Sequence, residues 1–195
     1  MYWKDEDGTG FKNFGALKKW LKTQKKELTF AMNGGMFHEG GIPVGLYIEN
    51  GKELNPLDTG KGNGNFYMKP NGVFAITKDK KAMVVETSSF KNSNILYATQ
   101  SGPMLLVNNH IHPSFNKTSA NLNIRNGVGV ASPTEIYFVI SKTKVNFHEM
   151  AQLFKEELKC PNALYLDGFV SKMYLPEKKP TDTEGDFGVI IAEVK

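Results

Sequence analysis

The chain has 195 residues, a formal net charge of +4 and 40% hydrophobic residues, enough apolar material for one folded domain over residues 1–195. The basic excess is small, so the composition argues against a nucleic-acid-binding protein. The single cysteine, Cys160, excludes an internal disulfide and argues against a cysteine-based zinc site. No apolar run is long enough to span a membrane.

The beginning of the chain leaves localisation open. Residues Tyr2 to Gly8 have the pattern of a strand end and a turn, and no signal peptide precedes them. We expect an original upstream segment to be absent from this sequence. Export to the periplasm or the cell exterior is therefore compatible with the sequence.

The first half of the chain predicts one amphipathic helix and several short strands. Apolar residues at spacings of three and four predict a helix from Phe14 to Gln24. The strand from Gly45 to Gly51 ends in an Asn-Gly pair, which is typical of a hairpin turn. Further strands are expected at residues 28–30, 66–69, 73–76, 82–85, 95–99 and 104–107.

The second half predicts one more helix, from Phe147 to Leu158, with Asn146 as its N-cap. Strands are expected at residues 124–130, 135–140, 163–166 and 188–194, and a loop at 113–121. The stretch from Tyr137 through the helix to Leu166 has the length of a strand–helix–strand crossover. The pattern predicts an α+β fold: a single domain with a large mixed, mostly antiparallel sheet and about two main helices.

Polar residues flanked by glycine follow or interrupt four of the predicted strands. They are Asn33-Gly34-Gly35, Gln100-Ser101-Gly102-Pro103, Arg125-Asn126-Gly127 and Asp167-Gly168. Backbone can approach a ligand closely beside glycine, so four such sites in one domain predict a common pocket. At Asn33 the glycine pair can take positive φ and aim N–H groups into that pocket, or simply form a tight turn.

Two charged residues stand out among these sites. Arg125 is the only arginine of the chain, and its planar fork suits bidentate binding of phosphate, although a structural ion pair is an alternative. Asp167 follows a buried strand, where an unpaired carboxylate is unfavourable. It is therefore either a turn-capping residue or a base, nucleophile or metal ligand.

The remaining polar candidates indicate no familiar catalytic motif. Ser101 lacks the Gly-x-Ser-x-Gly elbow of a serine hydrolase. The histidines show no zinc spacing, and an exposed or loop role suits them better than metal binding: they are His38, His110, His112 and His148.

The order of these motifs resembles the bacterial branch of the phosphodiester glycosidase family, over roughly residues 28–175. The matching stretches are Asn33-Gly34-Gly35-Met36-Phe37, Gln100-Ser101-Gly102-Pro103-Met104-Leu105, Arg125-Asn126-Gly127-Val128-Gly129 and Leu166-Asp167-Gly168. A related lysosomal member removes N-acetylglucosamine from a sugar-phosphate diester. The resemblance implies a mixed α/β domain, a hydrolase acting on glycosyl bonds, and a small-molecule or glycan sugar phosphate as substrate.

One stretch departs from the family pattern. Phe169 and Val170 replace glycines after Asp167, while Ser171 keeps the serine or threonine position. We expect Phe169 to reshape the pocket, so that the substrate differs from the lysosomal one.

The leading hypothesis is hydrolysis of a sugar-1-phosphodiester at the anomeric C–O bond, releasing free sugar and a phosphate monoester. Because a phosphate monoester leaves readily, the reaction needs less acid catalysis than an ordinary glycoside, and no obvious carboxylate pair is found. One alternative is a metal-dependent phosphodiesterase that cuts P–O. The other is a non-catalytic module that binds phosphorylated glycans, which the Phe169-Val170 replacement favours.

In the leading hypothesis Arg125 holds the phosphate, Asp167 activates water or stabilises the oxocarbenium-like centre, and His110 is a candidate acid or base. The residues expected to bind substrate oxygens are Asn33, Gly34, Gly35, Gln100, Ser101, Gly102 and Ser171. Ca²⁺ or Mg²⁺ on Asp167 and carbonyl oxygens is compatible with the sequence, although no ligand spacing indicates it.

Overall fold

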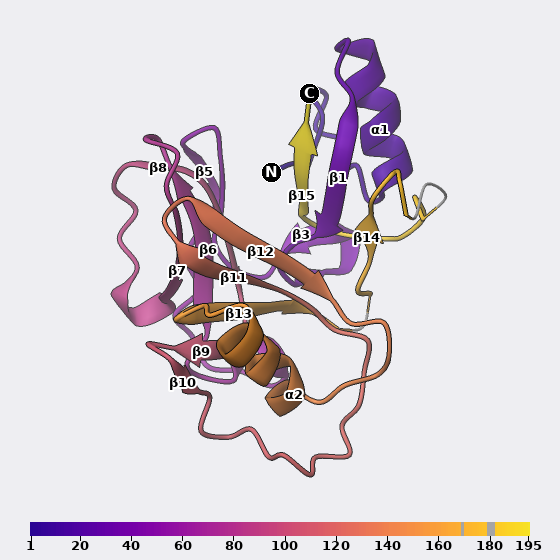
Figure 1. The fold of residues 1–195 in the computed structure, drawn as a ribbon. Helices are drawn as coiled ribbons and strands as arrows, with labels where there is room; N and C mark the ends of the chain where they lie inside the picture. The colour runs from indigo at the N-terminus through magenta and orange to yellow at the C-terminus, as the bar shows by residue number, and fades with distance from the viewer. Residues whose placement is uncertain (169, 179–181) are drawn as a thin grey trace.

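The computed structural model describes residues 1–168, 170–178 and 182–195. Strands dominate the fold, and every strand pair among the described residues is antiparallel. Figure 1 shows α1 beside the strands that carry the two chain ends, and α2 at the opposite end of the molecule. No helix within the described ranges has the length and apolar content needed to cross a membrane.

The first sheet has the order β14-β1-β15 and carries α1 on one side. Its strands are β1 (Leu28–Asn33), β14 (Met173–Tyr174) and β15 (Ile190–Val194). Helix α1 (Phe14–Thr23) begins where Asn13 accepts a hydrogen bond from Ala16 N. The helix buries Phe14, Leu17 and Leu21 against this sheet, as their spacing predicts.

The second sheet is five-stranded, with the order β5-β4-β8-β6-β7. Its strands are β4 (Tyr47–Glu49), β5 (Lys52–Asn55), β6 (Gly72–Thr77), β7 (Ala82–Glu86) and β8 (Ile95–Ser101). The β4–β5 turn has Asn50 at φ 52° and Gly51 at φ 79°, a backbone that this residue pair adopts readily. A separate two-stranded hairpin consists of β2 (Phe37–His38) and β3 (Ile42–Pro43), joined by η1 (Glu39–Gly41).

The third sheet has the order β10-β9-β13-β11-β12. Its strands are β9 (Met104–Val107), β10 (His110–Ile111), β11 (Asn126–Ser132), β12 (Glu135–Ile140) and β13 (Asn162–Asp167). Strands β12 and β13 both run antiparallel to β11, so they are parallel to each other. The chain connects them through α2 (Phe147–Gln152), which packs on one face of the sheet and forms the predicted crossover.

One apolar core joins the three larger sheets. It contains Met32 from β1, Phe74 from β6, Val128 from β11 and Leu164 from β13, all fully buried. Shared packing of this kind brings strand ends from different sheets to one place, because each strand must present its apolar side to the same interior. The ends of β1 and β13 and the start of β11 meet in this way.

The α+β class and the antiparallel pairing predicted from the sequence are confirmed, but the strands divide among several sheets instead of forming a single large one. The strand predicted at residues 66–69 is wrong. Gly64 turns the chain at φ 89°, and the following residues close short-range hydrogen bonds as the 3-10 helix η2 (Asn65–Tyr67). A similar short turn, η3 (Thr87–Ser89), follows β7. The predicted second helix continues past α2 as a π-helical turn, η4 (Leu153–Glu157).

Glycine is required in the middle of β11. A Cβ added at Gly129 would lie 2.5 Å from Phe154 Cδ1 and 2.7 Å from Cys160 Sγ. Gly129→Ala is therefore expected to lower the free energy of unfolding by about 1–3 kcal/mol through overpacking. That corresponds to a fall in Tm of about 2–4 °C per kcal/mol for a chain of this size. Gly10→Ala is the control, because its added Cβ has no neighbour closer than 3.8 Å. Equal thermal shifts for the two variants would contradict this account.

Candidate functional site

The side chain of Asn126 joins the three strand ends. Its Nδ2 donates to Asn33 Oδ1 (2.8 Å) and to Asn33 O (3.1 Å), at the end of β1. Its Oδ1 accepts from the Asp167 N–H at 2.8 Å, at the end of β13. Asn126 is completely buried, Asn33 is 1% exposed and Asp167 is 8% exposed. A buried amide must satisfy its polar atoms, so Asn126 holds these ends in one geometry.

The chain after β13 folds back onto the same network. Ser171 Oγ donates to Asp167 O at 2.5 Å and lies 3.4 Å from Asn126 Oδ1. The backbone N–H of Lys172 donates to Asn33 Oδ1 at 2.8 Å. Asn33, Asn126, Asp167 and Ser171 therefore form one connected set, hereafter the Asn126 network.

One donor of the network has no acceptor. Asn33 Nδ2 is buried and makes no hydrogen bond to any described residue. Its Oδ1 is occupied by Asn126 and Lys172, so the amide cannot reverse without losing those bonds. A buried donor of this kind costs free energy unless a water molecule or ligand oxygen binds it. Asn33 Nδ2 is thus a buried donor available to a water molecule or a ligand oxygen.

Tyr165 binds the chain's only arginine and lies within the electrostatic influence of Asp167. Arg125 Nη1 donates to the Tyr165 hydroxyl at 3.3 Å. Burial raises the pKa of Tyr165 to about 12; the charge of Asp167 also raises it, and Arg125 opposes the shift. The phenol therefore keeps its proton at neutral pH. A Cβ at Gly168 would lie 1.7 Å from the hydroxyl oxygen, so only glycine fits after Asp167.

Arg125 itself is buried, at 1% exposure. Its Nε donates to Val145 O (2.9 Å), and its Nη2 donates to Asn121 O (2.9 Å) and Asn121 Oδ1 (3.2 Å). Its guanidinium lies 3.8 Å from the centre of the Phe147 ring. Burial lowers the pKa of Arg125, yet a guanidinium stays protonated in proteins. The structure holds Arg125 on protein acceptors, and no acidic partner pairs with it among the described residues.

A row of stacked rings continues from this arginine. Phe115 lies 4.9 Å from Phe147, and His112 lies 4.6 Å from Phe115, with nearly parallel planes. His112 is 2% exposed, and its Nδ1 accepts from Ser114 N. The stack fixes the loop that precedes β11, and so it fixes the position of Arg125.

The glycine motif after β1 packs against β8. A Cβ on Gly35 would lie 2.4 Å from Gln100 O, so the backbones of the first two motifs touch. Neither Gly34 nor Gly35 has the positive φ allowed for in the sequence, and the Gly34 N–H donates to Val189 O at 2.8 Å. The predicted anion-binding turn is therefore wrong at Gly34, because the carbonyl of Val189, just before β15, accepts that N–H.

Gln100 and Ser101 belong to the scaffold. Gln100 Oε1 accepts from the N–H groups of Leu46 (3.0 Å) and Asp58 (2.9 Å), and its Nε2 donates to Asp58 O (2.6 Å) and Thr87 Oγ1 (3.2 Å). Ser101 Oγ donates to Leu166 O at 2.7 Å. The Ser101 bond links the second sheet to β13 directly beside Asp167. Gly102 lies against Asn71 and the carbonyl of Phe66.

Other predicted residues lie apart from the network. His110 is exposed on the edge strand β10, and its Nδ1 lies 2.8 Å from Asn108 O. Phe169, predicted to reshape the pocket, lies outside the described residues. No group of three His, Cys, Asp or Glu side chains gathers for a metal in the parts of the chain that are described. A cation on Asp167 would need amide and carbonyl oxygens as its other ligands.

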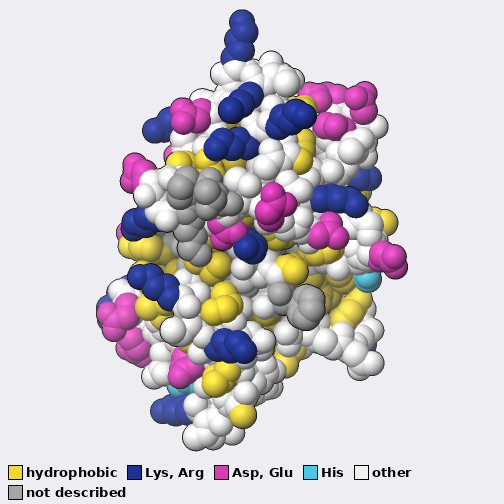
Figure 2. All heavy atoms as spheres, turned by 90° about the vertical axis from the view of Figure 1, so that its right-hand side faces the viewer, with side chains coloured by type: hydrophobic (Ala, Val, Ile, Leu, Met, Phe, Trp, Pro, Cys, Tyr) yellow, Lys and Arg dark blue, Asp and Glu magenta, His cyan; other side chains and the backbone are white. Residues whose placement is uncertain are grey.

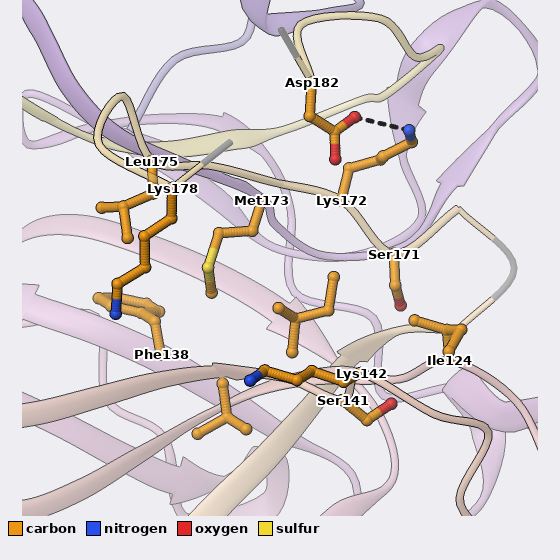
Figure 3. Close-up of a pocket in the computed structure, with 12 residues that line it drawn as sticks. Ile124, Phe138, Ser141, Lys142, Ser171, Lys172, Met173, Leu175, Lys178 and Asp182 are labelled. Carbon is orange, nitrogen blue, oxygen red and sulfur yellow. Dashed lines mark hydrogen bonds and ion pairs between the residues drawn. The ribbon is translucent and has the colours of Figure 1, made fainter. Parts of the chain in front are cut away.

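A cavity of about 580 Å³ reaches the network at Ser171 (Figure 3). Apolar side chains from β12 and from the chain around β14 form its walls. Lys142, Lys172 and Lys178 also line it, and Lys172 Nζ pairs with Asp182 at 2.6 Å. The cavity therefore combines apolar walls with positive charge close to Asp167.

The sequence alone does not single out Tyr165, the side chain of Asn126, or the three lysines as site residues. A tyrosine inside an otherwise aliphatic strand, two residues before Asp167, was a usable signal for Tyr165. Asn126 stood within a recognised motif beside the more conspicuous Arg125. The lysines resemble the chain's many solvated lysines, and only their position around the cavity distinguishes them.

A family model described as phosphodiester glycosidase matches residues 26–190. The chain belongs to the phosphodiester glycosidase family. The resemblance carried by the four motifs is thereby confirmed, and the chain has the fold of a family of glycosyl-bond hydrolases. All four motifs lie inside the matched range.

The chain is also similar to a curated protein and to a solved structure. The uncharacterized protein YigE of Escherichia coli is 39% identical over 176 residues, covering 90% of this chain and 68% of YigE. A zebrafish structure, the catalytic domain of N-acetylglucosamine-1-phosphodiester alpha-N-acetylglucosaminidase auto-inhibited by its pro-peptide, has a TM-score of 0.56 at 19% identity. That match covers 88% of this chain and 63% of the zebrafish chain. It shows a shared fold.

Asn126→Ala should test the network directly. It removes the acceptor of the Asp167 N–H and both hydrogen bonds to Asn33, and each buried group left unpaired costs about 1–3 kcal/mol. We expect the free energy of unfolding, measured with urea, to fall by at least about 2 kcal/mol. Asn92→Ala is the matched control: its exposed side chain donates to Glu53, and its loss should change stability by about 0.5 kcal/mol or less. Similar values for both variants would show that the network contributes no stability.

The buried His112 predicts a pH dependence of stability. Burial lowers its pKa below 6.5, so the folded chain binds the proton more weakly than the unfolded chain does. Its contribution to stability is present above pH 6.5 and is lost as the pH falls from there toward the folded-state pKa. His112→Phe keeps a ring against Phe115, and urea unfolding of this variant should show a flatter decline below pH 6.5. His38→Gln, at an exposed position, should follow the wild type. Parallel wild-type and His112→Phe profiles would refute this.

Proposed function

We propose that the protein hydrolyses a sugar-1-phosphodiester at the anomeric C–O bond and releases free sugar and a phosphate monoester. The observation that carries the proposal is the position of Asp167. Asp167 lies where all four family motifs meet. Its backbone N–H donates to Asn126, and the preceding carbonyl, that of Leu166, accepts from Ser101. Membership of the family supports the reaction class.

We assign the Asp167 carboxylate to act at the anomeric carbon, where the bond breaks. It is a nearly buried carboxylate whose main chain is held on both sides, by Asn126 and by Ser171. A fixed carboxylate of this kind can activate water or stabilise the positive charge that develops at the anomeric carbon. The free donor on Asn33 Nδ2 is available for an oxygen of the sugar or phosphate. Tyr165 is a protonated hydroxyl beside Asp167 and can donate in the same place.

The phosphate would be stabilised by positive charge around the site. Direct bidentate contact with Arg125 would require the guanidinium to exchange one of its present bonds, so we assign Arg125 to positioning Tyr165 and to the electrostatic field. Lysines around the adjoining cavity supply the further charge. Stabilising charge on the leaving phosphate lowers the need for a general acid, so the scheme does not depend on a second carboxylate.

Isotope labelling decides which bond breaks. Turnover of UDP-N-acetylglucosamine and of simple α- and β-linked sugar-1-phosphodiesters in H₂¹⁸O should place the label in the sugar. Asp167→Asn should lower kcat by about 10²-fold or more, as expected for loss of a positioned base. Asp7→Asn, at an exposed position, is the matched control and should leave kcat unchanged.

Label in the phosphate would instead establish P–O cleavage and exclude the proposed bond. Each assay is repeated with EDTA, and loss of activity that Ca²⁺ or Mg²⁺ restores would assign a cation to the site. If no diester is hydrolysed but a sugar-1-phosphate binds to the wild type, a binding module replaces the enzyme as the conclusion.

A further inference from the structure

Strand β12 presents an unpaired apolar edge. It is the outermost strand of its sheet, and among the described residues it pairs with β11 alone. Five consecutive apolar residues, Ile136 to Ile140, are all half-buried. Exposed apolar edge strands invite pairing or aggregation, and proteins usually blunt them with charge, proline or a covering segment. In Figure 1 the open side of β12 faces the sheet that contains β1 and β14.

Two cavities follow this edge and share Phe138 and Leu175. The first, about 580 Å³, reaches Ser171 at one end of β12. The second, about 590 Å³, continues to Ile136 and Phe30 at the other end. We call these two adjoining cavities together the β12 groove. Its apolar lining residues include Phe30, Ile136, Phe138, Ile140, Met173 and Leu175. At about 3.3 Å per residue, the run from Ile136 to Ile140 is roughly 13 Å long.

Lysines line the first cavity of the β12 groove, and one carboxylate, that of Glu193, lines the second. Lys142 and Lys178 both line the first cavity, and in Figure 3 their side chains extend along it toward Phe138. Neither forms an ion pair with a described residue, whereas Lys172 is paired with Asp182. Figure 2 shows hydrophobic side chains across the middle of this face, with lysines above and below them.

The lysines and the apolar walls of the β12 groove together favour a ligand that has an anionic group and an apolar part. The lysines suit an anion in the first cavity, the one that reaches Ser171. The walls along β12 are mainly apolar, although Thr29, Thr134, Tyr137 and Glu193 also line the second cavity. Sugar hydroxyls cost free energy when they are buried unpaired against the apolar part of these walls. An apolar chain would be stabilised there in proportion to the surface it buries. A second sugar suits the groove poorly, and an amphiphile suits it well.

We propose that the leaving group of the substrate is an amphiphilic phosphoester: its phosphate lies at Lys142 and Lys178, and its apolar body lies in the β12 groove. The assignment of this occupant as the leaving group rests on the proposed function. In the reaction, the anomeric C–O bond breaks, the bond electrons stay with the phosphate oxygen, and water supplies the new sugar hydroxyl. The substrate class is therefore a sugar linked through phosphate to a lipid-like alcohol.

The first experiment compares two diesters that differ only in the aglycone, methyl or octyl, on the same sugar-1-phosphate. We expect kcat/KM for the octyl diester to exceed that for the methyl diester by at least about ten-fold, given the discrimination apolar pockets achieve. Leu175→Ser should bring the octyl-to-methyl ratio of kcat/KM close to one. The double variant Lys142→Gln/Lys178→Gln should raise the KM for the octyl diester toward that for the methyl diester. Lys144→Gln, an exposed lysine that lines neither cavity, should leave both unchanged. Equal kcat/KM for the two diesters in the wild type overturns the inference.

Binding without turnover separates this inference from the proposed function. In calorimetry, octyl phosphate should bind the wild type at least about ten-fold more tightly than methyl phosphate or inorganic phosphate, and Leu175→Ser should remove that difference. If neither diester is hydrolysed but octyl phosphate binds as described, the proposed function fails and the groove assignment stands. If the diesters are hydrolysed without preference and octyl phosphate binds no better than phosphate, the groove assignment fails alone. Unfolding by urea confirms that each variant is folded.

Discussion

The fold and the candidate site depend on the hydrogen bonds of one buried side chain, Asn126. Apolar packing brings the ends of β1, β11 and β13 together, but packing is non-directional and tolerates small shifts. The hydrogen bonds of the Asn126 carboxamide are directional. They join Asn33 in β1 to Asp167 in β13, and so they fix the first sheet relative to the third. The main chain of Asp167 therefore stands at a defined point of the framework.

The family motifs divide into scaffold and site. Gln100 ties the Asp58 loop to β8, and Ser101 ties β8 to β13. Gly35 allows the backbones of two motifs to touch. These residues match a family signature, yet the polar side-chain atoms of Gln100 and Ser101 form hydrogen bonds with other parts of the chain. Arg125 is similar, because its guanidinium is stacked on Phe147 and bonded to loop carbonyls. The proposed function assigns the substrate instead to Asp167, Tyr165 and the donor Nδ2 of Asn33.

The β12 groove follows from the way the sheets are divided. Had β12 and β14 belonged to one continuous sheet, they would pair and leave no space between them. As edges of different sheets, they face each other across a depression whose walls are the side chains of both. An open, largely apolar surface therefore lies directly beside the buried Asn126 network. This juxtaposition suits a substrate with a sugar phosphate at one end and an apolar group at the other.

The sequence by itself determined the local elements and the identity of the motifs. Helix α1, the β4–β5 and β6–β7 hairpins and the crossover through α2 follow from spacing and turn residues, which act over a few positions. The four motifs and their family were also readable, as was their convergence. Only the tertiary structure decided which motif residues are occupied by the scaffold, because hydrogen bonds such as Gly34 to Val189 or Arg125 to Val145 join residues far apart in the chain. It also decided that β12 is an unpaired edge, since the apolar pattern of that strand is the same whether a neighbour covers it or not.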